Sequence, residues 1–135
     1  MNEVILKGGC LCGAVRYTFS GTPLSSTLCF CRSCRLASGS ASVAWFTGND
    51  IQLELRGTAP QIFKSSSAAE RAFCPFCGTP LLYKPKERPG TVEITTATLD
   101  NPELIRPTEE LWLSHKISWA VSDPDLKHSL RDGHG

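Results

Sequence analysis

Seven cysteines are the residues of this sequence most able to do chemistry, and their spacing divides them into three groups. Two lie in Cys10-Leu11-Cys12-Gly13, two in Cys74-Pro75-Phe76-Cys77-Gly78, and three in Cys29-Phe30-Cys31-Arg32-Ser33-Cys34. An odd number of cysteines cannot be used up by a complete set of disulfides. We therefore expect these thiols to bind metal ions.

The two paired groups predict one closed zinc site. Two cysteines separated by one or two residues can place both sulfurs about 2.3 Å from one zinc ion, and two such pairs complete a tetrahedron. Each pair is followed by a glycine, and Gly78 can adopt the positive φ that a tight turn around a metal needs. The expected ligands of this structural zinc are Cys10, Cys12, Cys74 and Cys77.

The remaining three cysteines predict a site of a different kind. Cys29, Cys31 and Cys34 lie within six residues and can converge on one ion. Three protein ligands leave the fourth zinc position open for chemistry. Three thiolates on Zn²⁺ give a net charge of about −1, which suits the metal to holding a substrate thiolate better than to activating water. The pattern favours sulfur chemistry over hydrolysis, with these three cysteines as the catalytic group.

Neighbouring residues leave two further questions at this second site. A closed structural site would need a fourth ligand, from His115, His128 or His134, and the thiols could also bind metal only weakly. Arg32 and Arg35 flank the cysteines and are candidate substrate-binding residues, because a guanidinium pairs well with the carboxylates of a peptide-like thiol. The alternative is that both arginines are solvent-exposed charges on a short helix.

Length and charge limit the classes of protein to consider. A chain of 135 residues fits a single domain, with a core of about 5–122 and a C-terminal tail at 123–135 that we expect to be frayed. Fourteen basic and 13 acidic residues give a net charge of +1, so neither nucleic acid nor an anionic membrane is an expected partner. With no signal-like leader and no run of about 20 apolar residues, a cytoplasmic location is expected, where cysteines usually serve metals or catalysis.

Hydrophobic patterning predicts a mainly β protein. Alternation and β-branched residues indicate strands at 14–19, 42–46, 51–55, 61–64, 81–83, 92–97 and 111–113. A short helix is expected around Arg32 to Ala37. A second is expected near Asp123 to Leu130, with Asp123 as its cap and Pro124 at its first position. The large aromatic residues expected in the core or on strands are Trp45, Phe46, Trp112 and Trp119.

Three segments in order resemble the glutathione-dependent formaldehyde-activating enzyme family. They are GGCLCGAVRY (8–17), CFCRSCRLASGS (29–40) and FCPFCGTPL (73–81), and the resemblance runs from about Gly8 to Trp119. It implies a β-tent fold, in which layered antiparallel sheets are joined by a four-cysteine zinc site. It also implies a second zinc on Cys29, Cys31 and Cys34, and carbon–sulfur lyase chemistry on S-(hydroxymethyl)glutathione.

Glutathione and formaldehyde follow from the resemblance alone, whereas two zinc sites and a preference for thiols follow from the cysteines themselves. The sequence departs from the family pattern at two places. Phe30 stands where the central motif commonly has histidine, and Glu109-Glu110-Leu111 stands where a histidine often precedes the last strands. An imidazole at Phe30 would be a proton carrier beside the metal. The alternative function is a non-catalytic zinc module that binds a protein or a small ligand.

Overall fold

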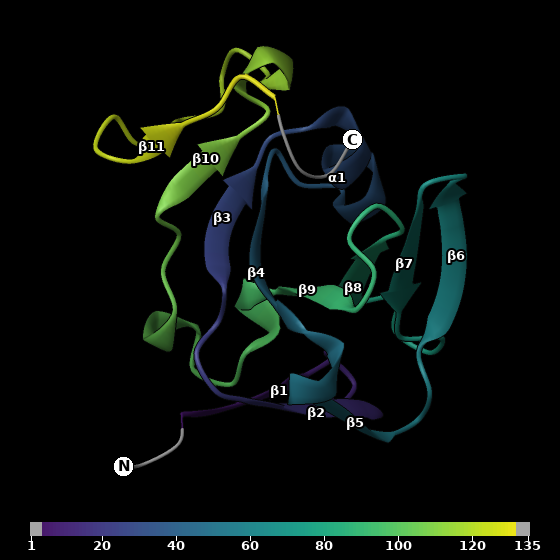
Figure 1. The fold of residues 1–135 in the computed structure, drawn as a ribbon. Helices are drawn as coiled ribbons and strands as arrows, with labels where there is room; N and C mark the ends of the chain where they lie inside the picture. Colours follow the sequence, from purple (N-terminus) through teal and green to yellow (C-terminus); the bar gives the residue numbers. More distant parts are fainter. Residues whose placement is uncertain (1–3, 132–135) are drawn as a thin grey trace.

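The computed structural model describes residues 4–131 and is built almost entirely from two β-sheets (Figure 1). The smaller sheet has the antiparallel order β1-β2-β5, formed by Ile5–Gly9, Val15–Ser20 and Leu53–Gly57. The larger has the order β11-β10-β3-β4-β9-β8-β7-β6. In that order its strands are Lys127–His128, Glu109–Leu111, Ser25–Cys29, Val43–Asn49, Thr91–Thr95, Pro80–Pro85, Ala69–Phe73 and Gln61–Ser66.

Helical structure is confined to short segments. The α-helix α1 spans Arg32–Ser38, as its sequence predicts, and begins directly after β3. Short 3₁₀ turns occupy Asp50–Gln52, Thr96–Thr98, Pro102–Leu104 and Leu113–His115. No helix within residues 4–131 is long and apolar enough to cross a membrane. The prediction of a mainly β chain with a short helix is confirmed.

The two sheets share one hydrophobic core. The alternating side chains of β2, Val15, Tyr17 and Phe19, point inward and pack with residues of the larger sheet. Phe19 meets Phe46 of β4 edge-to-face, with ring centroids 5.3 Å apart. Gly48 makes this approach possible, because a Cβ there would lie 2.3 Å from the Phe19 ring. The pattern of alternation along β2 therefore fixes how the smaller sheet lies on the larger one.

The cysteine pairs lie where the sheets meet. Cys10 and Cys12 occupy the turn between β1 and β2 of the smaller sheet, and Cys74 and Cys77 occupy the turn between β7 and β8 of the larger. This is the arrangement expected of a β-tent. One detail differs from purely antiparallel sheets: β10 pairs in parallel with both β3 and β11.

Several strands were not predicted from the sequence. Strands β1, β3 and β7 lie outside the predicted set, and the predicted strand at 51–55 begins as the 3₁₀ turn Asp50–Gln52 before continuing as β5. The predicted strand at 111–113 lies two residues earlier, as β10, and is followed by the 3₁₀ turn Leu113–His115. Strand ends are set by pairing partners far away in the chain, which local patterning does not show.

The prediction of a C-terminal helix near Asp123 to Leu130 is wrong. This segment forms turns and the strand β11, and within the described residues the tail is hydrogen-bonded to β10 rather than frayed. His134 lies outside the described residues. The expectation for Trp119 is also wrong, since its side chain is 74% exposed, whereas Trp45 and Phe46 are buried as expected.

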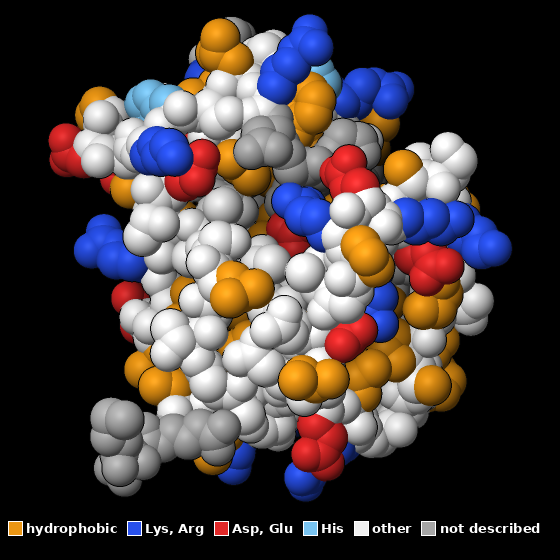
Figure 2. Space-filling view, in the orientation of Figure 1, with side chains coloured by type: hydrophobic (Ala, Val, Ile, Leu, Met, Phe, Trp, Pro, Cys, Tyr) orange, Lys and Arg blue, Asp and Glu red, His pale blue; other side chains and the backbone are white. Residues whose placement is uncertain are grey.

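The face of the molecule drawn in Figure 2 carries charged side chains of both signs. On this face, Lys and Arg side chains lie among Asp and Glu side chains, and much of the centre carries no charged side chain. This distribution agrees with the net charge of +1. It gives that face no extended basic stripe of the kind that binds nucleic acid.

Candidate metal centres and binding pocket

The sulfurs of Cys10, Cys12, Cys74 and Cys77 converge into what we call the four-cysteine cluster. All lie within 4.8 Å of one another. Two of the separations are 3.6 Å, from Cys10 to Cys12, and 3.7 Å, from Cys12 to Cys74. Sulfurs at the corners of a tetrahedron with zinc–sulfur bonds of about 2.3 Å are about 3.8 Å apart. The donor set and its spacing therefore fit a zinc ion.

Backbone N–H groups of the two turns point at these sulfurs. Val15 donates to Cys10 Sγ at 3.3 Å, and Phe76 and Cys77 donate to Cys74 Sγ at 3.4 and 3.5 Å. Hydrogen bonding to the Thr79 side chain is the largest of the effects that lower the pKa of Cys77, to about 5. Such donors stabilise thiolates, the form that binds metal.

Glycines shape both turns. Gly13 and Gly78 have φ values of 80° and 79°, in the left-handed region that residues with a Cβ rarely adopt. The positive φ expected of Gly78 is confirmed. The Gly78 N–H donates to the Cys74 carbonyl at 2.9 Å, which closes the turn around the sulfurs.

Cys29, Cys31 and Cys34 form the three-cysteine cluster, in which all three residues are buried and their sulfurs lie within 4.8 Å of one another. Cys29 ends β3, Cys31 is the N-cap of α1, and Cys34 lies within the helix. The Cys31 sulfur accepts the Cys34 N–H at 3.2 Å, as an N-cap side chain does. The junction between β3 and α1 thus brings the three sulfurs together, and pairing of β3 with β4 and β10 holds the strand end in place.

Cys29 and Cys34 hold their protons strongly when no metal is bound. Hydrogen bonds with Cys31 and Cys34, together with burial, raise the pKa of Cys29. At Cys34 a hydrogen bond with Cys29 lowers the pKa, but Cys31 and burial outweigh it and raise the value to about 11. A metal binding here therefore displaces protons.

Within residues 4–131, neither histidine considered as a fourth ligand joins the cluster. The His115 Nδ1 atom accepts the backbone N–H of Arg32 at 3.4 Å, and its ring lies 4.6 Å from that of Trp112. His128 is paired with Glu110. Among the described residues the cluster contains cysteines alone, so none of these residues supplies a fourth protein ligand.

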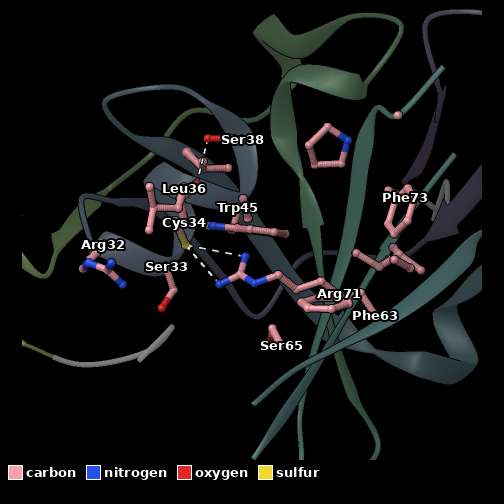
Figure 3. Close-up of a pocket in the computed structure, with 16 residues that line it drawn as sticks. Arg32, Ser33, Cys34, Leu36, Ser38, Trp45, Phe63, Ser65, Arg71 and Phe73 are labelled. Atoms are coloured by element: carbon pink, nitrogen blue, oxygen red, sulfur yellow. Dashed lines mark hydrogen bonds between the residues drawn. The ribbon is translucent and has the colours of Figure 1, made fainter.

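A pocket of about 650 Å³ opens beside the three-cysteine cluster, between α1 and the β6–β7 hairpin (Figure 3). Cys34 and Arg32 line it, but Arg35 does not. The Arg35 Nε atom is buried and has no hydrogen-bond partner in the described part of the chain. Of the two predicted substrate-binding arginines, the structure therefore brings only Arg32 to the pocket.

Comparison with known proteins places this arrangement in a family. The family model described as glutathione-dependent formaldehyde-activating enzyme matches residues 5–115, which include all seven cysteines. The chain belongs to this family. The match covers both cysteine clusters and all the residues that line the pocket.

Two relatives extend the comparison. A protein of Halomonas elongata, provisionally named a glutathione-dependent formaldehyde-activating enzyme, is 30% identical over 126 residues, covering 86% of this chain and 80% of its own length. A crystal structure of a Rhodobacter sphaeroides protein superposes with a TM-score of 0.61, covers 75% of this chain and 96% of its own, and is 23% identical. The second similarity supports the fold.

Arg71 lines the pocket but was not predicted as a site residue from the sequence. It extends from β7 toward α1, and its two terminal nitrogens lie 3.9 and 3.8 Å from Cys34 Sγ (Figure 3). Its guanidinium carbon lies 4.8 Å from the Tyr83 ring centroid. The available signal was weak: an arginine three residues before Cys74, in a segment that was not predicted to be a strand.

Proposed function

We propose that this chain is a zinc-dependent enzyme that makes or breaks the carbon–sulfur bond of a thiol–aldehyde adduct such as S-(hydroxymethyl)glutathione. The observation that carries the proposal is the convergence of three buried sulfurs, one of which, on Cys34, borders a pocket large enough for a small molecule. Family membership supplies the thiol and the aldehyde. We assign Cys29, Cys31 and Cys34 to the second zinc and to catalysis.

The three-cysteine cluster fits such a role by its donor chemistry. Three soft sulfur donors suit zinc, and the cluster contributes no fourth protein ligand from residues 4–131. When bound there, zinc supplies a position at which a substrate sulfur is kept as a nucleophilic thiolate near neutral pH. Cys31 is the N-cap of α1, and the Cys34 N–H holds its sulfur at the start of the helix.

The reaction moves few atoms. In cleavage, the carbon–sulfur bond breaks and its electron pair stays on sulfur, while the hydroxyl O–H bond breaks and its electrons form the C=O bond of formaldehyde. The hydroxyl proton passes to water in the pocket, and formation of the adduct is the reverse. The Arg71 guanidinium, beside Cys34, stabilises the negative charge that remains on the thiolate-rich cluster. Phe30 is 1% exposed and contributes no proton carrier.

The four-cysteine cluster has a separate role in this proposal. Its ligands would close the coordination sphere completely, so it takes no part in the reaction. It ties the β1–β2 turn of the smaller sheet to the β7–β8 turn of the larger, the sheet that also carries Arg71. Cys10, Cys12, Cys74 and Cys77 would thus hold a structural zinc that keeps the pocket's strand in place.

The test measures glutathione–formaldehyde exchange by NMR together with zinc stoichiometry, with and without glutathione. Cys31→Ser is the informative variant, because serine is a good N-cap and α1 should still form. We expect exchange to fall to the uncatalysed rate and bound zinc to fall from two ions to one. The control is Arg56→Gln, at an exposed position on β5 of the smaller sheet. Its exchange rate and zinc content should equal those of the wild type. Equal exchange by Cys31→Ser and the wild type would end the proposal.

A further inference from the structure

We infer, on the basis of the proposed function, that the pocket selects a thiol with an apolar body and one carboxylate close to its sulfur, held by Arg71. Among the thiols that the proposed function allows, the inference favours a class other than glutathione. It depends on the surroundings of Arg71, on its distance from the cluster, and on the residues that line the rest of the pocket.

Arg71 is a buried cation that has no carboxylate partner in the described part of the chain. Its side chain belongs to a residue only 9% exposed, and within residues 4–131 no carboxylate forms an ion pair with it. Its contacts are the two long N–H···S interactions with Cys34 and the face of Tyr83. Burial of a guanidinium is costly unless an anion meets it, and its planar donors match a carboxylate in bidentate geometry. The thiolate-rich cluster meets Arg71 through two long contacts to a single sulfur, so the planar donors remain arranged to receive a carboxylate.

The position of Arg71 limits where that group can be on the ligand. Both terminal nitrogens lie within 4 Å of the Cys34 sulfur, one of the three that converge in the cluster. A thiol that joins this cluster places its own sulfur beside that of Cys34. Its carboxylate then reaches Arg71 only if one or two carbons separate it from the sulfur. In glutathione both carboxylates lie at the far ends of a tripeptide, many bonds from the sulfur.

The rest of the pocket favours an apolar body. Its large side chains are apolar or aromatic: Leu36, Val43, Trp45, Phe63, Phe73 and Leu82. Arg32 and Arg71 are the charged residues on its wall, and no Asp or Glu of the described chain lines it. An ammonium group like that of glutathione would find no carboxylate here. An arylalkyl or alkyl mercaptocarboxylate would place hydrocarbon against these side chains instead.

Three small thiols and glutathione test the selection on the full-length, zinc-loaded protein. The first probe is 2-mercapto-3-phenylpropanoate, the second is its uncharged primary amide, and the third is 2-phenylethanethiol. Binding is measured by isothermal titration calorimetry, a readout independent of catalysis. We expect the acid to bind at least tenfold more tightly than the amide, the neutral thiol or glutathione. Equal affinity of acid and amide, or tighter binding of glutathione, would overturn the inference.

Two variants test whether Arg71 is the source of the selection. Arg71→Gln should abolish the preference for acid over amide while leaving binding of the amide within about threefold of the wild type. Arg56→Gln, an arginine exposed on β5, should retain the full preference. A preference that survives Arg71→Gln overturns the assignment. If circular dichroism shows that Arg71→Gln does not fold, the comparison of acid and amide on the wild type decides by itself.

The outcomes separate this inference from the proposed function. If thiols bind but acid and amide bind equally, the selection by Arg71 is wrong while the thiol-binding role stands. If none of the thiols binds the zinc-loaded protein, both the inference and the proposed function fail. A carboxylate preference together with glutathione–formaldehyde exchange that Cys31→Ser does not slow would support the inference and reject the proposed reaction.

Discussion

The Glu110 carboxylate, which solvent does not reach, lies 3.0 Å from the Nε2 atom of His128. It also accepts the backbone N–H of Asp123 at 3.1 Å. These contacts join β10 to the C-terminal segment. Ser129 of that segment adds backbone hydrogen bonds, donating its N–H to the Glu110 carbonyl and accepting the Leu113 N–H. Glu110 is therefore the residue that fixes this segment beside β10, the strand that pairs with β3.

Replacing His128 with alanine should lower the stability of the fold. The variant leaves the buried Glu110 carboxylate with a backbone N–H as its partner among the described residues. We expect the free energy of unfolding to fall by about 1–2 kcal/mol. This is less than for a fully buried pair, because the imidazole is partly exposed. His128→Gln, which can still donate a hydrogen bond, should recover part of the loss. Urea unfolding of the zinc-loaded proteins measures both. An unchanged midpoint for His128→Ala would show that the contact contributes nothing.

Local spacing accounts for what the sequence predicted correctly. Cys29, Cys31 and Cys34 were predictable as a group because they lie within six residues, at the end of β3 and in the first turn of α1, although β3 itself is held by pairing with β4 and β10. The positive φ at Gly78 and the inward alternation of β2 are equally local. The four-cysteine cluster was predictable for a different reason, because each cysteine pair needs a second pair to complete a tetrahedron.

Features that depend on distant contacts were not predictable in the same way. Asp123 and Pro124 are good helix-start residues, but the backbone N–H of Asp123 is used by Glu110, and the segment forms β11 instead. Arg71 reaches Cys34 across 37 positions of sequence, from a strand that alternation did not reveal. In both cases tertiary pairing overrides local propensity.

Removal of zinc should affect the two clusters differently. A weak chelator is expected to remove the ion of the three-cysteine cluster first and to leave the fold intact, because that cluster lies within one local segment. A strong chelator should remove the second ion and unfold the protein, because the four-cysteine cluster joins the two sheets. Circular dichroism and zinc release are followed together. Unfolding in step with the first ion released would contradict this assignment.

Gly78→Ala should weaken zinc retention in addition to stability. No atom lies within 4 Å of the Cβ that alanine would add, so the cost comes from the left-handed backbone and is about 1 kcal/mol. Gly90 is the matched control, since it has a φ of 81° and equally open surroundings but lies in the β8–β9 turn, away from the cysteines. Gly90→Ala should lose similar stability without faster zinc loss to a chelator. Equal zinc retention by the two variants would show that the backbone at Gly78 does not shape the metal site.

Alkaline pH should unfold the protein through its two tyrosines, Tyr17 and Tyr83. Burial raises the pKa of each to about 12, and at Tyr17 a hydrogen bond with Thr98 only partly opposes this. In the unfolded chain a tyrosine ionises near pH 10, so the unfolded state gains stability from ionisation above that pH while the folded state does not. The tyrosines thus stabilise the fold fully below pH 10, and this contribution is lost between about pH 10 and 12.

Absorbance at 295 nm should show no tyrosinate in the folded, zinc-loaded protein at pH 10, and Tyr17→Phe should flatten the decline in stability. Tyrosinate at pH 10 without loss of structure would mean that the rings are accessible to solvent.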